Sequence, residues 1–164
     1  MNLINAIKQF KKSPNNSFSI YLFHGVIKKF NKKNSVANYN NKHIHIKKFT
    51  TFIKEISKIG NAISMNDIYE ITQRKKKLKK KSFAITFDDG FENNYSIAAP
   101  ILINYKIPFT FYITTSFVDR NAMSWIDKVD YAIDKTKKKY INVPELKMTF
   151  QIKNRKSKIN FLNK

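Results

Sequence analysis

The sequence predicts an α/β protein built around a parallel sheet. The segment Phe83–Phe87 (Phe-Ala-Ile-Thr-Phe) alternates at the period of a strand and has no polar face, which is typical of a strand covered on both sides. Strand and helix patterns alternate along residues 17–114, as in a parallel sheet or barrel. Two adjacent carboxylates, Asp88 and Asp89, follow this strand directly, where parallel folds place their ligand sites.

The first strand is predicted at residues 17–23, which are rich in aromatic and β-branched side chains. It ends at His24 and Gly25. The polar segment 31–41 is rich in Asn and Lys and predicts a loop. We therefore expect the first strand to be followed by a loop and then by the first helix that packs on the sheet.

Two helices are predicted between this strand and the acidic one. From Ile46 to Ile59, apolar residues recur at intervals of three and four, which predicts an amphipathic helix with Gly60 as its C-terminal cap. Ser64, followed three residues later by Asp67, predicts the N-cap of a shorter helix through Ile71.

Beyond the acid pair the sequence predicts another helix and another strand. The buried face of this helix is expected to consist of Tyr95, Ala98, Ala99 and Leu102. Pro100 lies within this stretch and should kink the helix or remove a backbone hydrogen bond. Pro108 then opens a strand over residues 109–114.

The C-terminal region predicts one helix, one strand and the start of a second helix. Ser124 and Asp127 have capping-box spacing, which predicts a helix that runs to about Asp134. Residues 147–152 predict a late strand, and the tail after them begins a further helix.

Length and composition restrict the class of protein. The chain has 164 residues, of which 42% are hydrophobic, enough for one domain with a real core. It has no cysteine, which excludes disulfides and thiolate metal sites and fits a reducing compartment. No apolar run has the length of a signal peptide or a membrane span. We therefore expect a cytoplasmic protein with no membrane span.

The net charge of +21 leaves open an alternative, a non-catalytic basic protein that binds nucleic acid or another polyanion. The densest run, Arg74–Lys81, has seven cations in eight residues but no aromatic side chain on which bases could stack. A basic run between a helix and a strand is usually a solvated loop. Lys, Asn and Ile are all abundant and Gly is rare, a joint bias that codon supply could produce. Nucleic acid is therefore not the expected partner.

A set of segments in fixed order surrounds the acid pair. It comprises Ile85–Phe91, Asn93–Tyr95, Ala99–Leu102, Ile107–Pro108 and Thr110–Tyr112, with Tyr21–Val26 upstream and Trp125–Asp127 downstream. In this order they resemble polysaccharide deacetylases of the NodB-homology type, which are carbohydrate esterase family 4-like. The resemblance covers residues 17–134. It divides the chain into a basic lead (1–16), a partial deacetylase domain (17–134) and an insert or truncated tail (135–164).

The resemblance implies the N-terminal portion of a deformed (β/α) barrel that hydrolyses N-acetyl groups of a polysaccharide with a divalent metal, zinc being the one expected. By motif it implies that Asp88 is the general base and Asp89 a metal ligand. A metal polarises the amide carbonyl and activates water, and a carboxylate can accept the proton of that water. The alternative for the pair is a strand-to-helix turn in which an Asp caps the next helix.

The histidines depart from the family pattern, in which a downstream His-Ser/Thr-x-x-His motif completes the metal site. His24, His43 and His45 are the only histidines and all precede Asp88. We therefore expect an incomplete metal site and little deacetylase activity from this chain alone. Three explanations of the missing histidine motif remain open: the chain is a truncated product, a second chain completes the site, or the protein is a relative that only binds. An unpaired sheet edge would also favour self-association.

Substrate contact is predicted for two further residues. His24 should leave the first strand at the same sheet edge as the acid pair, where substrate contact, hydrogen bonding and packing are all open. Trp125 could stack on a sugar, with a buried aromatic at a helix start as the alternative. His43 and His45 would share a face of an extended segment, but their position before the first helix favours a structural role.

Overall fold

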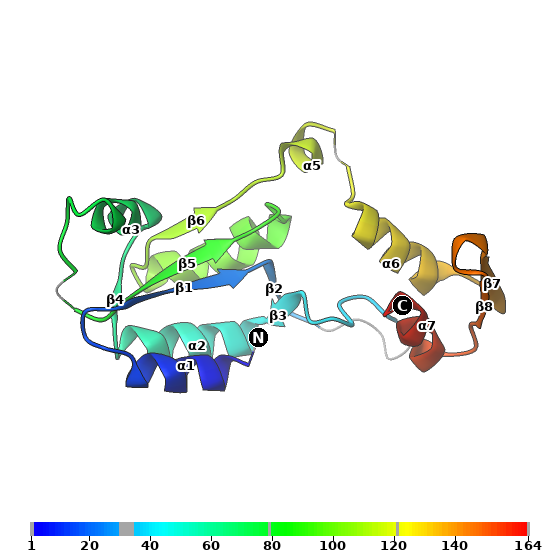
Figure 1. The fold of residues 1–164 in the computed structure, drawn as a ribbon, viewed down its shortest axis with the longest axis horizontal. Helices are drawn as coiled ribbons and strands as arrows, with labels where there is room; N and C mark the ends of the chain where they lie inside the picture. The colour runs from blue at the N-terminus through cyan, green and yellow to red at the C-terminus, as the bar shows by residue number, and fades with distance from the viewer. Residues whose placement is uncertain (1, 30–34, 79, 121, 164) are drawn as a thin grey trace.

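A computed structural model describes residues 2–29, 35–78, 80–120 and 122–163, and its centre is a parallel sheet (Figure 1). The strands of this sheet are β1 (Phe18–Phe23), β4 (Asn61–Ala62), β5 (Ser82–Phe87) and β6 (Phe109–Phe111). All four run parallel. The predicted α/β class with a parallel sheet is therefore confirmed.

The central strand is β5, in which every residue is buried. β1 pairs with β5 along its whole length, from Phe18 opposite Ser82 to Phe23 opposite Phe87. β4 pairs with the first residues of β5 and β6 with the last three. Because β1 occupies one edge of β5 completely, β4 and β6 share the other edge.

Two helices, α1 (Leu3–Lys12) and α2 (Ile46–Ser57), lie together against one face of the sheet (Figure 1). Aromatic rings meet edge to face there: Phe23 lies 5.2 Å from Phe49, and Phe52 lies 5.0 Å from Tyr21 between ring centroids. Such pairs add about 1 kcal/mol each to the burial of the rings. The helix predicted from Ile46 is present as α2, which begins at that residue and ends at Ser57, shortly before the predicted end.

α1 falls within the predicted basic lead and contributes to the core. Its Phe10 is buried, with its ring centroid 6.2 Å from that of Phe83 in β5. The helix is amphipathic, because Leu3, Ile7 and Phe10 recur at helical spacing on the side that packs against the core. The same spacing is visible in the sequence and could have predicted this helix, which was described only as part of a basic lead.

Gly60 is not a left-handed cap of α2. The C-cap is Lys58, which has right-handed backbone angles, and Gly60 has no positive φ. A Cβ atom on Gly60 would lie 2.6 Å from the ring of Phe10. The glycine therefore allows α1 to approach closely, and the prediction of a glycine cap was wrong. α3 (Met65–Thr72) begins with the predicted capping box of Ser64 and Asp67.

The helix after the acid pair has two parts, a single π-helical turn η1 (Asn94–Ala98) and α4 (Ala99–Asn104). Pro100 lies in the first turn of α4, where its missing N–H costs little. Asn94, Ala98, Ala99 and Leu102 are buried, whereas Tyr95 is 78% exposed. The prediction for Tyr95 was wrong because the wider π turn moves Asn94 to the buried face in its place.

The remaining elements form a short parallel pair and a C-terminal lobe. β2 (Gly25–Ile27) pairs with β3 (His43–His45). Beyond β6 follow α5 (Thr115–Asp119), α6 (Trp125–Lys135), β7 (Tyr140–Val143), η2 (Pro144–Leu146), β8 (Met148–Gln151) and α7 (Arg155–Leu162). The predicted helix after Ser124, the late strand and the tail helix are all present. β7, which pairs antiparallel with β8, was not predicted.

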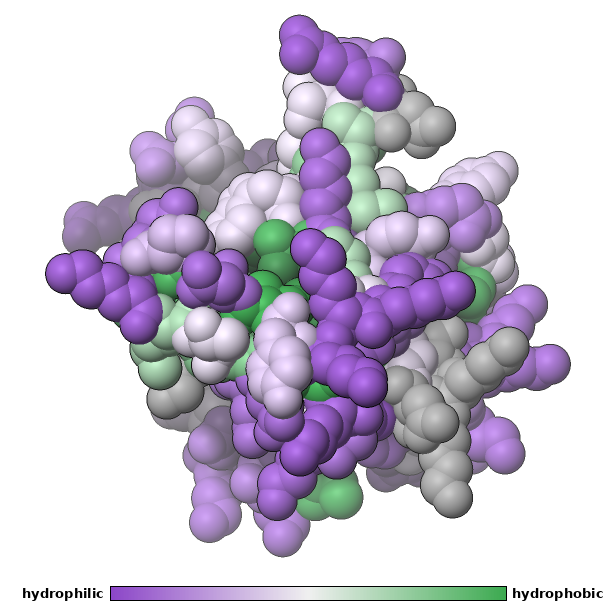
Figure 2. Space-filling view, turned by 90° about the vertical axis from the view of Figure 1, so that its right-hand side faces the viewer, coloured by the Kyte–Doolittle hydropathy of each residue, from purple (hydrophilic) through white to green (hydrophobic). Residues whose placement is uncertain are grey.

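The C-terminal lobe, α6 to α7, lies at one end of the sheet (Figure 1) and is attached to the segment 35–42. The N–H of Val36 donates to Oδ1 of Asp134 at 2.7 Å. Nε of Arg155 donates to the carbonyl oxygen of Ser35 at 2.9 Å. Seen from this side, hydrophilic side chains cover most of the surface around a small apolar area (Figure 2). Within the described ranges, no helix has both the length and the apolar character needed to cross a membrane.

Candidate functional site

The acid pair lies where three strands end side by side. The N–H of Asp88 donates to the carbonyl oxygen of Phe23 at 3.0 Å, and the N–H of Tyr112 donates to that of Phe87 at 2.8 Å. β1, β5 and β6 therefore end at one level, and the chain turns directly after β5. We call residues 88–91 the acid turn.

The acid turn has an unusual backbone. Asp89 has φ of 72° and Gly90 has φ of 71°, so two successive residues are left-handed. Glycine adopts this conformation readily, whereas an aspartate adopts it at a cost of about 1 kcal/mol or more. A Cβ on Gly90 would also lie 3.1 Å from the side chain of Ile113.

Asp89 is paired with a lysine. Nζ of Lys42 lies 3.3 Å from Oδ2 of Asp89 and 3.4 Å from Oδ2 of Asp127 in α6. The same ammonium lies 4.5 Å from the ring centroid of Phe91. The three charged side chains are 19–27% exposed. One cation, supplied by the chain itself, therefore pairs with a carboxylate of the acid turn and with a carboxylate of α6.

Asp88 has a different environment. It is partly buried, yet no hydrogen bond or ion pair reaches its carboxylate from any residue that the structure describes. The two neighbouring acids are therefore distinct chemically, one paired and one available.

His43 connects β3 to the helix that follows the acid turn. Its Nδ1 lies 3.2 Å from Nδ2 of Asn93, and Oδ1 of Asn93 accepts a hydrogen bond from the N–H of Val26 at 3.3 Å. Its ring packs edge to face on Phe91 at 4.8 Å. Burial, followed by the charge of Lys42, lowers the pKa of His43 below its usual value of 6.5.

Gly25 makes this arrangement possible. A Cβ atom there would lie 2.1 Å from Nδ1 of His43 and 2.4 Å from Oδ1 of Asn93. The backbone of β2 thus approaches the side chains of His43 and Asn93 so closely that only glycine fits at this position.

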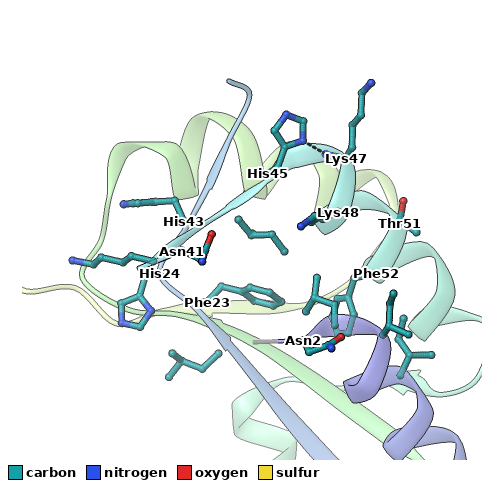
Figure 3. A pocket seen from close by; sticks show the side chains of 16 residues that line it. Asn2, Phe23, His24, Asn41, His43, His45, Lys47, Lys48, Thr51 and Phe52 are labelled. Carbon is teal, nitrogen blue, oxygen red and sulfur yellow. Dashed lines mark hydrogen bonds between the residues drawn. The ribbon is translucent and has the colours of Figure 1, made fainter. Parts of the chain in front are cut away.

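His24 leaves β1 at the same sheet edge as the acid turn. With its amide oriented to satisfy both neighbours, buried Asn94 donates to the carbonyl oxygen of His24 at 3.0 Å and accepts from the N–H of Phe91 at 3.3 Å. The His24 side chain itself lines a cavity of about 920 Å³, together with His43, His45, Phe23 and Phe52 (Figure 3). Asp88 and Asp89 are not among the residues that line this cavity.

Trp125 is the first residue of α6 and is 75% exposed, so the alternative of a buried aromatic at a helix start does not hold. Two residues later, Asp127 contacts Lys42, which brings the N-terminus of α6 to the acid turn. His45 caps α2, because its Nδ1 accepts from the N–H of Lys47 at 3.2 Å (Figure 3). His43 and His45 therefore have separate structural roles.

The residues that the structure describes do not fit a divalent metal by themselves. Among them, no group of three or more His, Asp or Glu side chains could hold a metal ion. Asp89, the acid expected to be a ligand, is already occupied by an ammonium group. A catalytic zinc needs three protein ligands, so this part of the chain lacks a complete set.

The basic run lies far from the acid turn along β5. It connects α3 to the amino end of β5, whereas the acid turn follows the carboxyl end. Lys76 pairs with Asp67, and Nζ of Lys81 donates to the carbonyl oxygen of Lys11 at 2.8 Å. These contacts are those of a solvated connecting loop.

Comparisons with known proteins bear on the chain that carries this parallel sheet and acid turn. Residues 75–153 match the model of the polysaccharide deacetylase family. The predicted resemblance to this family is therefore confirmed for that region, which begins within the basic run and ends just after β8. No curated protein matches the chain.

Two solved structures share the fold. A de-N-acetylase from Aggregatibacter actinomycetemcomitans is similar with a TM-score of 0.53 and 23% identity, over 62% of this chain and 39% of that one. The Streptococcus pyogenes deacetylase PplD, solved in complex with acetate, is similar with a TM-score of 0.53 and 17% identity, over 68% and 48%. The chain thus spans less than half the length of either protein.

Proposed function

We propose that this chain supplies the N-terminal portion of a domain that hydrolyses N-acetyl groups of a polysaccharide. The observation that carries the proposal is the acid turn, in which an unpaired and a paired carboxylate lie side by side where β1, β5 and β6 end. The match to the deacetylase family includes this turn. A partly buried carboxylate that only supports the fold is normally paired or hydrogen-bonded. A carboxylate without such a partner is therefore suited to take part in a reaction.

In this proposal Asp88 is the general base. Its carboxylate has no competing partner among the described residues and can accept a proton from a water molecule. Asp89 contributes to a divalent metal site, zinc being the metal expected, that needs ligands beyond those described here. A bound metal would polarise the amide carbonyl of the substrate. Since the present residues do not hold a metal by themselves, we assign no reaction step to one.

Substrate contacts are proposed for His24 and Trp125. His24 lines the cavity beside the end of β1, so its imidazole could donate to a sugar hydroxyl. Trp125 is exposed at the start of α6, and an exposed indole is a suitable surface for stacking on a sugar ring. The domain in question spans residues 17–134, with residues 1–16 before it and residues 135–164 as an insert or tail.

We further propose that the chain alone has little activity and that another polypeptide segment completes the site. β1 has one neighbour, β5, among the described strands, and its Ile20 and Leu22 are 44% and 45% exposed. An unpaired strand edge with exposed apolar side chains favours pairing with a further segment or with another chain.

A chimera tests the proposal. The whole chain, which keeps α1 and its Phe10 in the core, would replace the matching part of the Streptococcus pyogenes deacetylase. Acetate release from N-acetylated glycan oligomers would be measured with added zinc. We expect release that Asp88→Asn reduces by at least about 100-fold. Glu92→Gln, a change at an exposed acid near the turn, should retain it. Equal release from a folded Asp88→Asn chimera would contradict the assignment.

The whole chain offers a second measurement that does not require activity. N-acetylated oligosaccharide should shift the amide NMR signals of residues 88–91 and the indole signal of Trp125. An unchanged spectrum at millimolar oligosaccharide would contradict the proposed substrate site.

A further inference from the structure

The C-terminal lobe carries a second concave site, a groove of about 650 Å³ lined by residues 136–140, 151–153 and 158. We call it the lysine groove. We propose that it binds an acidic polysaccharide, one whose sugars carry anionic oxygen groups, and that the substrate of the chain is of this class. This inference deepens the proposed function and rests on it in one respect, the assignment of the substrate as a glycan.

The charge of the lysine groove is of one sign. The cations that line it are Lys137, Lys138, Lys139, Lys153 and Lys158. Among the residues that the structure describes, no aspartate or glutamate lines the groove, and none of these ammonium groups forms a salt bridge. The side of the molecule that carries the lobe is largely hydrophilic (Figure 2). Like charges gathered in a concave surface focus a positive potential, which attracts anions.

Hydrogen bonds hold the groove in shape. The N–H of Ile152 donates to the carbonyl oxygen of Lys139 at 2.7 Å, which continues the pairing of β7 with β8. Nζ of Lys158 donates to the carbonyl oxygen of Asp134 at 2.6 Å, so α7 is tied to the end of α6. The lysines therefore project from a fixed frame, which lowers the entropy cost of binding.

An aromatic side chain among these lysines favours a sugar over other anions. Tyr140, at the start of β7, is 57% exposed. Its hydroxyl accepts a hydrogen bond from Nε2 of Gln151 at 3.1 Å, which orients the ring. A ring held in this way can stack on a sugar while the lysines contact its anionic groups. Single-stranded nucleic acid is bound by several aromatic side chains in succession, and this groove offers one among the described residues.

α6 joins the lysine groove to the acid turn (Figure 1). Asp127 in its first turn contacts Lys42, the partner of Asp89, and its last residue directly precedes the groove. The eleven residues of this helix span about 16 Å. The match to the deacetylase family covers residues 75–153 and so includes most of the groove. A polysaccharide at the acid turn could therefore continue along α6 into the groove.

Binding of defined oligomers to the whole chain tests the inference. The probes are a hexamer of galacturonic acid, which is an acidic glycan, and a hexamer of thymidine nucleotides, which is a polyanion of another class. Titration calorimetry at pH 7 and physiological ionic strength screens contacts with isolated surface charges. We expect the galacturonate hexamer to bind to the wild type.

Two double variants with the same net charge locate the binding. Lys138→Gln/Lys153→Gln removes two charges from the groove, and Lys75→Gln/Lys77→Gln removes two exposed charges from the basic run. The groove variant should bind the galacturonate hexamer at least about tenfold more weakly than the wild type. The control should remain within about twofold. Equal binding to both variants, or no binding to the wild type, would overturn the inference.

Tyr140→Thr separates a glycan site from a site for any polyanion. It keeps a residue that suits a strand and should weaken the galacturonate hexamer at least about fivefold, with the nucleotide hexamer within about twofold. Equal behaviour of the two probes in every variant would assign the groove to polyanions in general and would also overturn the inference. Thermal melting verifies folding, and Tyr140→Val replaces Tyr140→Thr if the latter does not fold.

The galacturonate hexamer has no acetamide group, so its binding does not depend on deacetylase activity. Galacturonate binding in the groove together with an inactive chimera would contradict the proposed function and leave the groove as a site for acidic glycans. An active chimera whose chain does not bind galacturonate would have the opposite meaning.

Discussion

The N–H of Asp88 donates to the carbonyl oxygen of Phe23 at 3.0 Å, so the last residue of β1 holds the first residue of the acid turn. This bond fixes the level at which both strands end. As a result His24 and the acid pair leave the sheet at one edge, although His24 and Asp88 are 64 positions apart in sequence.

Asp88 and Asp89 should respond differently to neutralisation. Asp89→Asn removes one carboxylate from the pair with Lys42, and we expect it to lower the free energy of unfolding by about 1 kcal/mol. Asp88→Asn removes no contact and should change it by less than about 0.5 kcal/mol. Urea denaturation at pH 7 measures both. A larger loss for Asp88→Asn would mean that its carboxylate has a structural partner.

The N-terminal helix should be essential for stability. Phe10 is 1% exposed in the core, and Phe10→Ala should lower the free energy of unfolding by about 3 kcal/mol or more. Ile4→Ala is the control, because Ile4 lies on the same helix and is 67% exposed. Its effect should be within about 0.5 kcal/mol. If both variants melted like the wild type, α1 would not be packed on the sheet in solution.

The capping box of α3 should make stability depend on acid pH. Hydrogen bonds from Lys76 and Ser64 lower the pKa of Asp67 to about 2. Because this pKa is below the usual 3.8, the contribution of Asp67 is present above pH 4 and is lost as the pH falls toward 2. Asp67→Asn should flatten the stability profile in that window, as measured by thermal melting between pH 2 and pH 5. Ser64→Ala should cost about 1 kcal/mol at pH 7.

His43 should make the protein less stable in mild acid. Its folded-state pKa is lowered, by burial first and by Lys42 second, so the unfolded chain binds a proton more readily. Stability is therefore full above pH 6.5 and decreases as the pH falls below that value. NMR titration of the His43 ring should give a pKa below 6.5 that rises in Lys42→Met. A pKa that did not respond to this variant would place the ammonium elsewhere.

Much of the fold could be predicted from the sequence because its signals are local. Alternation of apolar residues defined β5, helical spacing defined α2, and Ser64 and Ser124 marked the starts of α3 and α6. The acid pair was visible for the same reason, as an apolar strand followed by two carboxylates and a glycine. Tyr95 was placed wrongly because a π turn has no comparable sequence signal.

What the tertiary structure decided was which charges meet. Lys42 is one of 32 basic residues, and nothing in its neighbourhood in sequence distinguishes it from the others. It reaches Asp89 and Asp127 only because β3 lies beside β2 and the lobe docks on residues 35–42. Sequence determines the type of site through short-range pattern, whereas long-range packing determines the counter-ion, because an ion pair depends on distance in space.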